Sequence, residues 1–209
     1  MKPPLSAVLW DVGGIVYVTP FELAGELEAA HGLPTGTLPR GPFADGGDGD
    51  YAAVDAGVLP EPAYWRRSRL ALLEAGVDVD VHRDIRWQGR ERPEVLPVLR
   101  AVAASGYRQG ALTNDASGFL GAGWQSTWPW RHLFDAVVDS VEIGVRKPHP
   151  DAYRAAADAL RQPPEACLFV DDLTVNVDAA RAVGMAALRF DVTDPAGSAA
   201  AVLAHTGLA

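Results

Sequence analysis

The chain has 209 residues, of which 48% are hydrophobic and 22% are charged, and its formal net charge is −9. This length suits one domain, or one domain that carries a small insertion. The composition is that of a globular protein with enough apolar side chains for a core. An acidic chain without a basic cluster is a poor candidate for binding nucleic acid or an anionic membrane surface, so we expect neither partner.

The sequence also bears on where the protein works. No stretch approaches the roughly 20 consecutive apolar residues of a membrane helix, and the N-terminal MKPPLSAVLW lacks the long apolar region of a signal peptide. The single cysteine, Cys167, lies in the apolar run ACLFV, which excludes an internal disulfide and suits a reducing compartment. We expect a cytoplasmic protein in which Cys167 is a small buried core residue.

The first predicted element is a strand over AVLWDV (7–12), followed by a glycine turn. Residues 18–92 then show helical patterns and no strong strand. These patterns cover 21–32, 51–57 and 62–76, and a Gly- and Pro-rich connection that we expect to be flexible covers 33–50. We therefore expect a helical insertion over 18–92 in a core formed by 1–17 and 93–209. Its aromatic residues are expected mostly to form the insertion's own core, with one facing a ligand: Tyr51, Tyr64, Trp65 and Trp87.

Beyond residue 92, strand and helix patterns alternate. Short apolar runs bounded by turn residues predict strands over 109–114, 136–140, 166–172 and 186–191. Helical patterns cover 93–106, 150–161 and 176–185, with Gly106 and Gly184 at the ends of the first and last. Strands that alternate with helices of this length predict an α/β fold with a doubly wound parallel sheet.

Polar residues follow the predicted strands at the sheet edge where open parallel sheets bind ligands. They are Asp11, Thr113, Asn114, Asp171 and Asp172, and GVRKPHP (144–150), just before a predicted helix, supplies Lys147. Carboxylates packed together raise one another's pKa unless a cation neutralises them, and a hard divalent cation such as Mg²⁺ meets that need. Such an ion, a lysine and a hydroxyl or amide donor can bind a phosphate dianion, while a carboxylate can attack its phosphorus.

Four motifs in this order resemble those of the haloacid dehalogenase (HAD) superfamily. They are LWDVGGIV (9–16), ALTND (111–115), VRKPHPDAY (145–153) and CLFVDDLTVNVDAARAVGM (167–185). The sequence is particularly similar to the subfamily with a small helical cap, which includes bacterial sugar phosphatases and the N-terminal phosphatase domain of soluble epoxide hydrolase. The resemblance implies a Rossmann-like core, a cap over 18–92 and a Mg²⁺-dependent phosphatase that acts on a small phosphorylated metabolite.

The resemblance implies a metal site made of residues from the first and fourth motifs. Asp11 would be both the nucleophile and a ligand of Mg²⁺. The backbone carbonyl of Gly13 and the carboxylate of Asp172 would complete the protein's share of the metal site. Asp171 and Asn176 would hold ligands or metal-bound waters in place.

The second and third motifs imply a phosphate site. Thr113 would donate a hydrogen bond to the transferring phosphoryl group, with Asn114 beside it, and Lys147 would pair with both the phosphate and the nucleophile. Asp115 follows directly, and it is a candidate either for this site or for a turn or helix start.

The first motif departs from the family pattern because Gly13 stands where a second Asp normally acts as general acid and base. Such help contributes roughly 10²–10⁴-fold to the rate. Three alternatives follow from its absence. The substrate has a good leaving group, such as a sugar 1-phosphate or an acyl phosphate; Asp171, His149 or a substrate group substitutes; or the chain is a phosphate- or partner-binding protein on a degenerate scaffold.

After the phosphatase and the binding protein, a dehalogenase is the third possible function, because the same fold carries that chemistry with an Asp nucleophile and no metal. The family's dehalogenases lack the acidic pair of the fourth motif, so Asp171 and Asp172 favour the metal-dependent phosphatase. The sequence leaves the substrate and the oligomeric state open. It also leaves open whether Trp124, Trp128 and Trp130 pack against the core or form an exposed apolar patch, which would indicate an interface.

Overall fold

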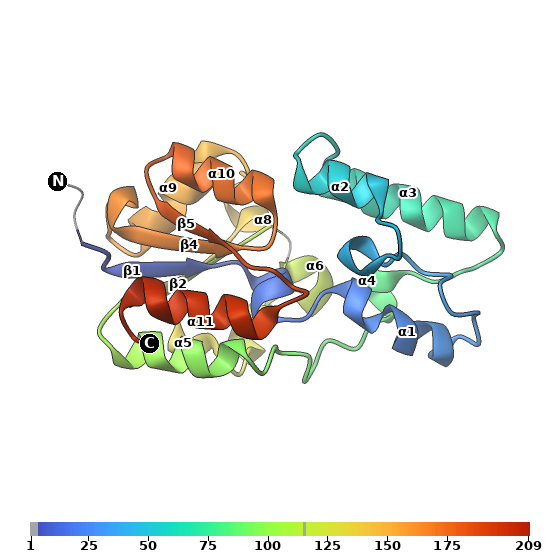
Figure 1. Cartoon of the computed structure of the whole chain (residues 1–209), viewed down its shortest axis with the longest axis horizontal. Helices are drawn as coiled ribbons and strands as arrows, with labels where there is room; N and C mark the ends of the chain where they lie inside the picture. Colours follow the sequence, from blue (N-terminus) through green and yellow to red (C-terminus); the bar gives the residue numbers. More distant parts are fainter. Residues whose placement is uncertain (1–3, 115) are drawn as a thin grey trace.

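The computed structural model describes residues 4–114 and 116–209. Its centre is a parallel sheet with the strand order β3-β2-β1-β4-β5 (Figure 1). The strands are β1 (Ala7–Trp10), β2 (Arg108–Thr113), β3 (Ala136–Asp139), β4 (Cys167–Asp171) and β5 (Ala186–Arg189). Every predicted strand is present, and each ends one or two residues earlier than predicted. The doubly wound parallel α/β fold is therefore confirmed.

Helices cover both faces of the sheet. On one face lie α5 (Val95–Ala104) and α11 (Pro195–Thr206), and on the other lie α9 (Pro150–Ala159) and α10 (Thr174–Ala182) (Figure 1). Strand β1 shows why both faces must be covered, because successive side chains of a strand point to opposite sides. Val8 and Trp10 pack into the apolar cluster under α5 and α11, whereas Ala7 and Leu9 pack into the cluster under α9 and α10.

The described residues between 18 and 92 form helices and no strand. The helices are α1 (Pro20–Ala30), α2 (Gly49–Asp55), α3 (Glu61–Glu74) and α4 (Val81–Asp84). The α1 helix begins with a capping box, in which Thr19 and Glu22 each accept a backbone hydrogen bond from the other. In Figure 1 these helices lie beyond the end of β1, on the side toward which the parallel strands point.

The connection over residues 33–50 is anchored to α1 by a buried carboxylate. Glu28 accepts backbone hydrogen bonds from Gly36 at 3.0 Å and from Leu38 at 2.8 Å, and it pairs with Arg40. A single 3₁₀ turn follows at Gly41–Phe43. The stretch that we expected to be a flexible connection therefore has defined hydrogen bonds to the helix before it.

The remaining helices are short, namely α6 (Ala116–Leu120), α7 (Trp124–Thr127) and α8 (Ser140–Ile143). Trp124 and Trp128 are buried, and Trp128 stacks on Phe134 with ring centroids 4.7 Å apart. Trp130 is half-buried beneath the guanidinium of Arg100. Of the two alternatives for these tryptophans, packing against the core is confirmed. No helix in the described part of the chain is both long and apolar enough to cross a membrane.

Cys167 is fully buried at the start of β4, and burial raises the pKa of its thiol to about 11. Because the thiolate is the reactive form, we expect the native protein to resist iodoacetamide at pH 8. In urea the same reagent should modify one cysteine per chain, as mass spectrometry would show. Rapid modification of the native protein would contradict the buried position.

Candidate active site

Asp11 lies where β1 ends and a single π-type turn, η1 (Val12–Val16), begins. Its backbone N–H donates to the Val170 carbonyl at 2.9 Å, which extends the sheet by one residue. Its side-chain Oδ1 accepts from the Val12 N–H at 2.6 Å, and Oδ2 lies 2.9 Å from the Lys147 ammonium. Both oxygens are thus held in place, and Asp11 lines a cavity.

The two glycines after Asp11 have different reasons to be glycine. Gly14 has a φ of +75°, and a Cβ there would lie 2.6 Å from Oδ2 of Asp172, so only glycine fits. Gly13 has an ordinary φ of −70°, and a Cβ there would meet nothing within 4 Å. The backbone therefore does not require glycine at position 13, and the missing side chain leaves open space in the cavity.

Lys147 is buried between two carboxylates. Besides Asp11, its ammonium contacts Oδ2 of Asp171 at 2.7 Å. Burial alone would lower the pKa of Lys147, but the charges of Asp11 and Asp171 raise it above its ordinary value. The other oxygen of Asp171 accepts from the Leu173 N–H at 2.9 Å and from the Asn176 amide at 3.0 Å. Asn176 therefore orients Asp171, and Asp171 in turn positions the Lys147 ammonium.

The side chains expected to substitute for the missing acid at position 13 do not face the cavity. Asp171 is fully buried, with both oxygens engaged. His149 has a side chain that is 60% exposed, and it caps α9 by accepting from the Asp151 N–H. Neither is among the described residues that line the cavity. The structure thus supports neither residue as the substitute.

Thr113 and Asn114 follow one another at the end of β2, and both line the cavity. Thr113 is buried. Oδ1 of Asn114 accepts from the Lys147 N–H at 2.8 Å and from the Ser140 hydroxyl at 3.1 Å, while its Nδ2 donates to the Lys147 carbonyl. These bonds make Asn114 a residue that positions the Lys147 loop. Asp115 lies outside the described residues.

Three carboxylates meet at this edge of the sheet. Asp11, Asp171 and Asp172 each offer an oxygen, and these oxygens lie within 4.8 Å of one another. Burial and the charge of Asp171 raise the pKa of Asp11 to about 7, although Lys147 opposes the shift. Burial and the charges of Asp171 and Asp11 also raise the pKa of Asp172 well above its ordinary value. Asp11 and Asp172 line the cavity whereas Asp171 is fully buried and is not among the described lining residues, so the carboxylates suited to ligate a metal are Asp11 and Asp172.

The cavity has a volume of about 390 Å³ and lies between the sheet edge and the helices of residues 18–92. Its lining includes all four aromatic residues that the sequence singled out, rather than one: Tyr51, Tyr64, Trp65 and Trp87. Further lining residues were not predicted from the sequence, and they come from α1, α3, α4 with its preceding residue, and α6: Phe21, Glu61, Asp80, His82 and Phe119. No local motif marks these residues, because only the packing of distant segments brings them together.

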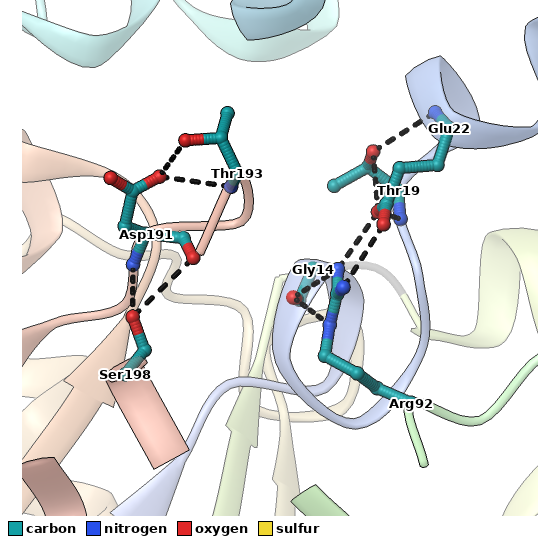
Figure 2. A network of polar contacts seen from close by, with 7 residues as sticks. All are labelled: Gly14, Thr19, Glu22, Arg92, Asp191, Thr193 and Ser198. Atoms are coloured by element: carbon teal, nitrogen blue, oxygen red, sulfur yellow. Dashed lines mark hydrogen bonds and ion pairs between the residues drawn. The ribbon is translucent and has the colours of Figure 1, made fainter. Parts of the chain in front are cut away.

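A buried arginine joins the site to both ends of the inserted segment (Figure 2). The Nε and Nη2 atoms of Arg92 donate to the Gly14 carbonyl at 3.2 and 3.1 Å. Its guanidinium also pairs with Glu22, the capping-box partner of Thr19, at 2.8 Å. The Arg92 backbone N–H donates to the Val16 carbonyl at 2.7 Å. The segment that leaves the sheet after β1 and the segment that returns to it at Arg92 are thus hydrogen-bonded to each other beside Gly14.

Replacement of Arg92 by methionine is expected to lower the free energy of unfolding by about 3 kcal/mol, because the Gly14 carbonyl and Glu22 lose a buried charged partner. The matched control is Arg90→Met, which breaks an exposed pair with Glu26 and should cost about 0–1 kcal/mol. Urea unfolding followed by circular dichroism measures both. Equal losses for the two variants would contradict a structural role for the buried network.

Comparison with known proteins identifies the family. The model of the haloacid dehalogenase-like hydrolase family matches residues 48–184. Phosphatase MT3486 from Mycobacterium tuberculosis is 30% identical over 190 residues, which cover 90% of this chain and 88% of that protein. The chain therefore belongs to the HAD-like hydrolases. Two other curated relatives are much longer proteins. The chain spans 18% of acyl-CoA dehydrogenase family member 10 from Mus musculus and 37% of bifunctional epoxide hydrolase 2 from Sus scrofa.

Solved structures show the same fold with different chemistries. The L-2-haloacid dehalogenase from Xanthobacter autotrophicus aligns with a TM-score of 0.61 at 20% identity, over 88% of this chain and 77% of that one. A HAD phosphatase from Thermococcus onnurineus aligns with a TM-score of 0.53 at 19% identity, over 90% and 86% of the two chains. Because the dehalogenase and the phosphatase share the fold, the fold does not distinguish dehalogenation from phosphate hydrolysis, and only the residues of the site can do so.

Proposed function

We propose that this HAD-like hydrolase is a Mg²⁺-dependent phosphatase that acts on a small phosphate monoester through an aspartyl-phosphate on Asp11. The observation that carries the proposal is the grouping of Asp11, Thr113, Lys147 and Asp172 around one cavity. The name of the mycobacterial relative supports it. The free Cys167 thiol supports a cytoplasmic location.

The proposed reaction has two displacements at phosphorus. In the first, a carboxylate oxygen of Asp11 attacks the phosphorus and the bond to the leaving-group oxygen breaks. In the second, water attacks the phosphorus of the aspartyl-phosphate, which regenerates Asp11 and releases phosphate. Lys147 neutralises the phosphate charge, and the Thr113 hydroxyl donates to a phosphoryl oxygen.

Carboxylate oxygens at a buried, like-charged site are the donors that suit Mg²⁺. Asp11, Asp172 and the Gly13 carbonyl would hold the ion, and when bound it supplies positive charge that offsets the charge of the phosphoryl oxygens. The raised pKa values of Asp11 and Asp172 support this assignment. A raised pKa means that the carboxylate anion is disfavoured at this site, and a bound cation would stabilise it. Asn176 contributes through its hydrogen bond to Asp171.

We also infer that residues 18–92 act as a cap over a core formed by 1–17 and 93–209. The lining of the cavity supports this division, because its apolar wall comes largely from α1, α2 and α3 while its polar floor comes from the sheet edge. A cap of this kind excludes water during the first displacement and selects the leaving group.

Two reactions measured side by side test the proposed function. Release of inorganic phosphate from p-nitrophenyl phosphate should require Mg²⁺ and stop with EDTA. Release of chloride from 2-chloropropionate should be absent with or without metal. Chloride release that EDTA leaves unchanged would establish the dehalogenase reading instead.

A binding protein without turnover is the second candidate, and the open position at Gly13 is the observation that favours it. Binding of Mg²⁺ and inorganic phosphate, measured by calorimetry, without phosphate release from any ester would establish this candidate.

A further inference from the structure

Aromatic rings form the wall of the cavity opposite Asp11. Phe21 and Trp65 stack with ring centroids 5.0 Å apart and planes at 21°, and Tyr51 packs edge-on against Phe21 at 5.2 Å. Trp87 and Phe119 form a second group, with centroids 5.0 Å apart. All of these residues line the cavity. Such a wall suits a flat, apolar group, because aromatic rings favour stacked and edge-to-face contacts with other rings.

The charges along this wall disfavour a leaving group that is itself anionic. Glu61 and Asp80 line the cavity from the capping side, and both are carboxylates. The lysine and arginine among the described lining residues, Lys147 and Arg146, both belong to the loop before α9. A phosphate at Asp11 is therefore matched by positive charge, whereas a second negative charge near the rings would meet like charge.

The open position at Gly13 restricts the leaving group further. No carboxyl group stands there to protonate the departing oxygen, and one oxygen of each carboxylate on the opposite wall already accepts hydrogen bonds. Glu61 accepts a hydrogen bond from the Trp65 indole at 3.3 Å, and Asp80 caps α4 through the His82 and Arg83 N–H groups. An oxygen that departs without a proton must be a weak base. A phenol, with a pKa of about 10, meets this condition far better than an aliphatic alcohol, whose pKa is close to the 15.7 of water.

We propose that the substrate is an aryl phosphate without a second negative charge, a proposal that rests on the phosphatase function proposed above. Asp11 attacks the phosphorus, and the phosphorus–oxygen bond to the ring breaks. The aryl oxide leaves with the electron pair and takes its proton from solvent. Water then releases phosphate from Asp11, so that one water is consumed for each ester.

Four esters separate the parts of this proposal in an assay of phosphate release with Mg²⁺. Phenyl phosphate has a leaving group that is aromatic and weakly basic, whereas the leaving group of benzyl phosphate is aromatic but strongly basic. Acetyl phosphate has a leaving group that is weakly basic but not aromatic. Phosphoglycolate has a leaving group that carries a negative charge. We expect kcat/KM, which reports the first displacement, to be at least about 100-fold higher for phenyl phosphate than for benzyl phosphate, the lower end of what a general acid contributes. We expect KM to be lower for phenyl phosphate than for acetyl phosphate, and phosphoglycolate to be the poorest of the four.

The variant Trp65→Leu tests the aromatic wall. The ratio of kcat/KM for phenyl phosphate to that for acetyl phosphate should fall about tenfold, equivalent to about 1.4 kcal/mol. Phe43→Leu, at a 37% exposed ring outside the described lining, should leave the ratio unchanged. Equal kcat/KM for phenyl and benzyl phosphate, a preference for phosphoglycolate, or an unchanged ratio in Trp65→Leu would overturn the proposal. Absence of Mg²⁺-dependent release from all four esters would instead overturn the phosphatase function itself.

Discussion

Replacement of Asp11 by asparagine is expected to lower phosphate release at least about 1,000-fold, because the amide cannot attack phosphorus as a carboxylate does. The substitution preserves the size of the side chain, so the hydrogen bond from the Val12 N–H is retained. Initial rates with phenyl phosphate and Mg²⁺ measure the effect. The fold should persist, since Asp11 lies at the end of β1 rather than within its apolar core.

The control for this variant is Asp178→Asn, on the exposed side of α10, where the carboxylate pairs with Arg181. Its phosphate release should equal that of the wild type. Circular dichroism and thermal unfolding of both variants should show folded proteins. Undiminished phosphate release by Asp11→Asn would contradict the role of Asp11 as nucleophile, whatever the metal dependence.

Replacement of Gly13 by aspartate is expected to raise kcat for alkyl phosphates about 100-fold, because it supplies the missing general acid and base. The structure permits the change, since φ at Gly13 is −70° and a Cβ there meets nothing within 4 Å. The kcat/KM of phenyl phosphate, which reports the first displacement, should rise much less, because its leaving oxygen needs little protonation. Steady-state kinetics on benzyl and phenyl phosphate measure this difference directly.

The control is Gly13→Asn, which adds a side chain of the same shape without an acidic proton. It should give no gain with benzyl phosphate. If Gly13→Asp gives no gain either, while phenyl phosphate is still turned over, another group already protonates the leaving oxygen. That result would contradict the role assigned to the open space at position 13.

The core of the fold could be predicted from the sequence because its signals are local. Each buried strand is a short apolar run, and each is followed by turn residues or by a polar residue such as Asp11 or Thr113. Helix α11 was not predicted, although Asp194 and Pro195 are ordinary helix-start signals, because the alanine-rich stretch after them has little contrast between polar and apolar positions. Helix α10 begins earlier than predicted, at Thr174.

The candidate site could be predicted only in part. The motif at the first strand end located Asp11, because parallel strands bring their carboxyl ends to one edge, and the motif just before a predicted helix located Lys147. The motifs could not show that Asn114 binds the backbone of Lys147 or that Asp171 is fully buried and absent from the described cavity lining. Those facts depend on side-chain direction. The role of Arg92 depends on contacts across 78 residues of chain and has no local signal at all.

The most direct test of the account is the mass of the intact protein after brief reaction with phenyl phosphate and Mg²⁺ and quenching in acid. The account predicts that wild-type protein gains the mass of one phosphoryl group, that peptide mapping places it on Asp11, and that Asp11→Asn gains none. Without a base at position 13 to activate water, this species should accumulate. Steady turnover with no phosphoryl group on Asp11, or with the group on another residue, would contradict the account.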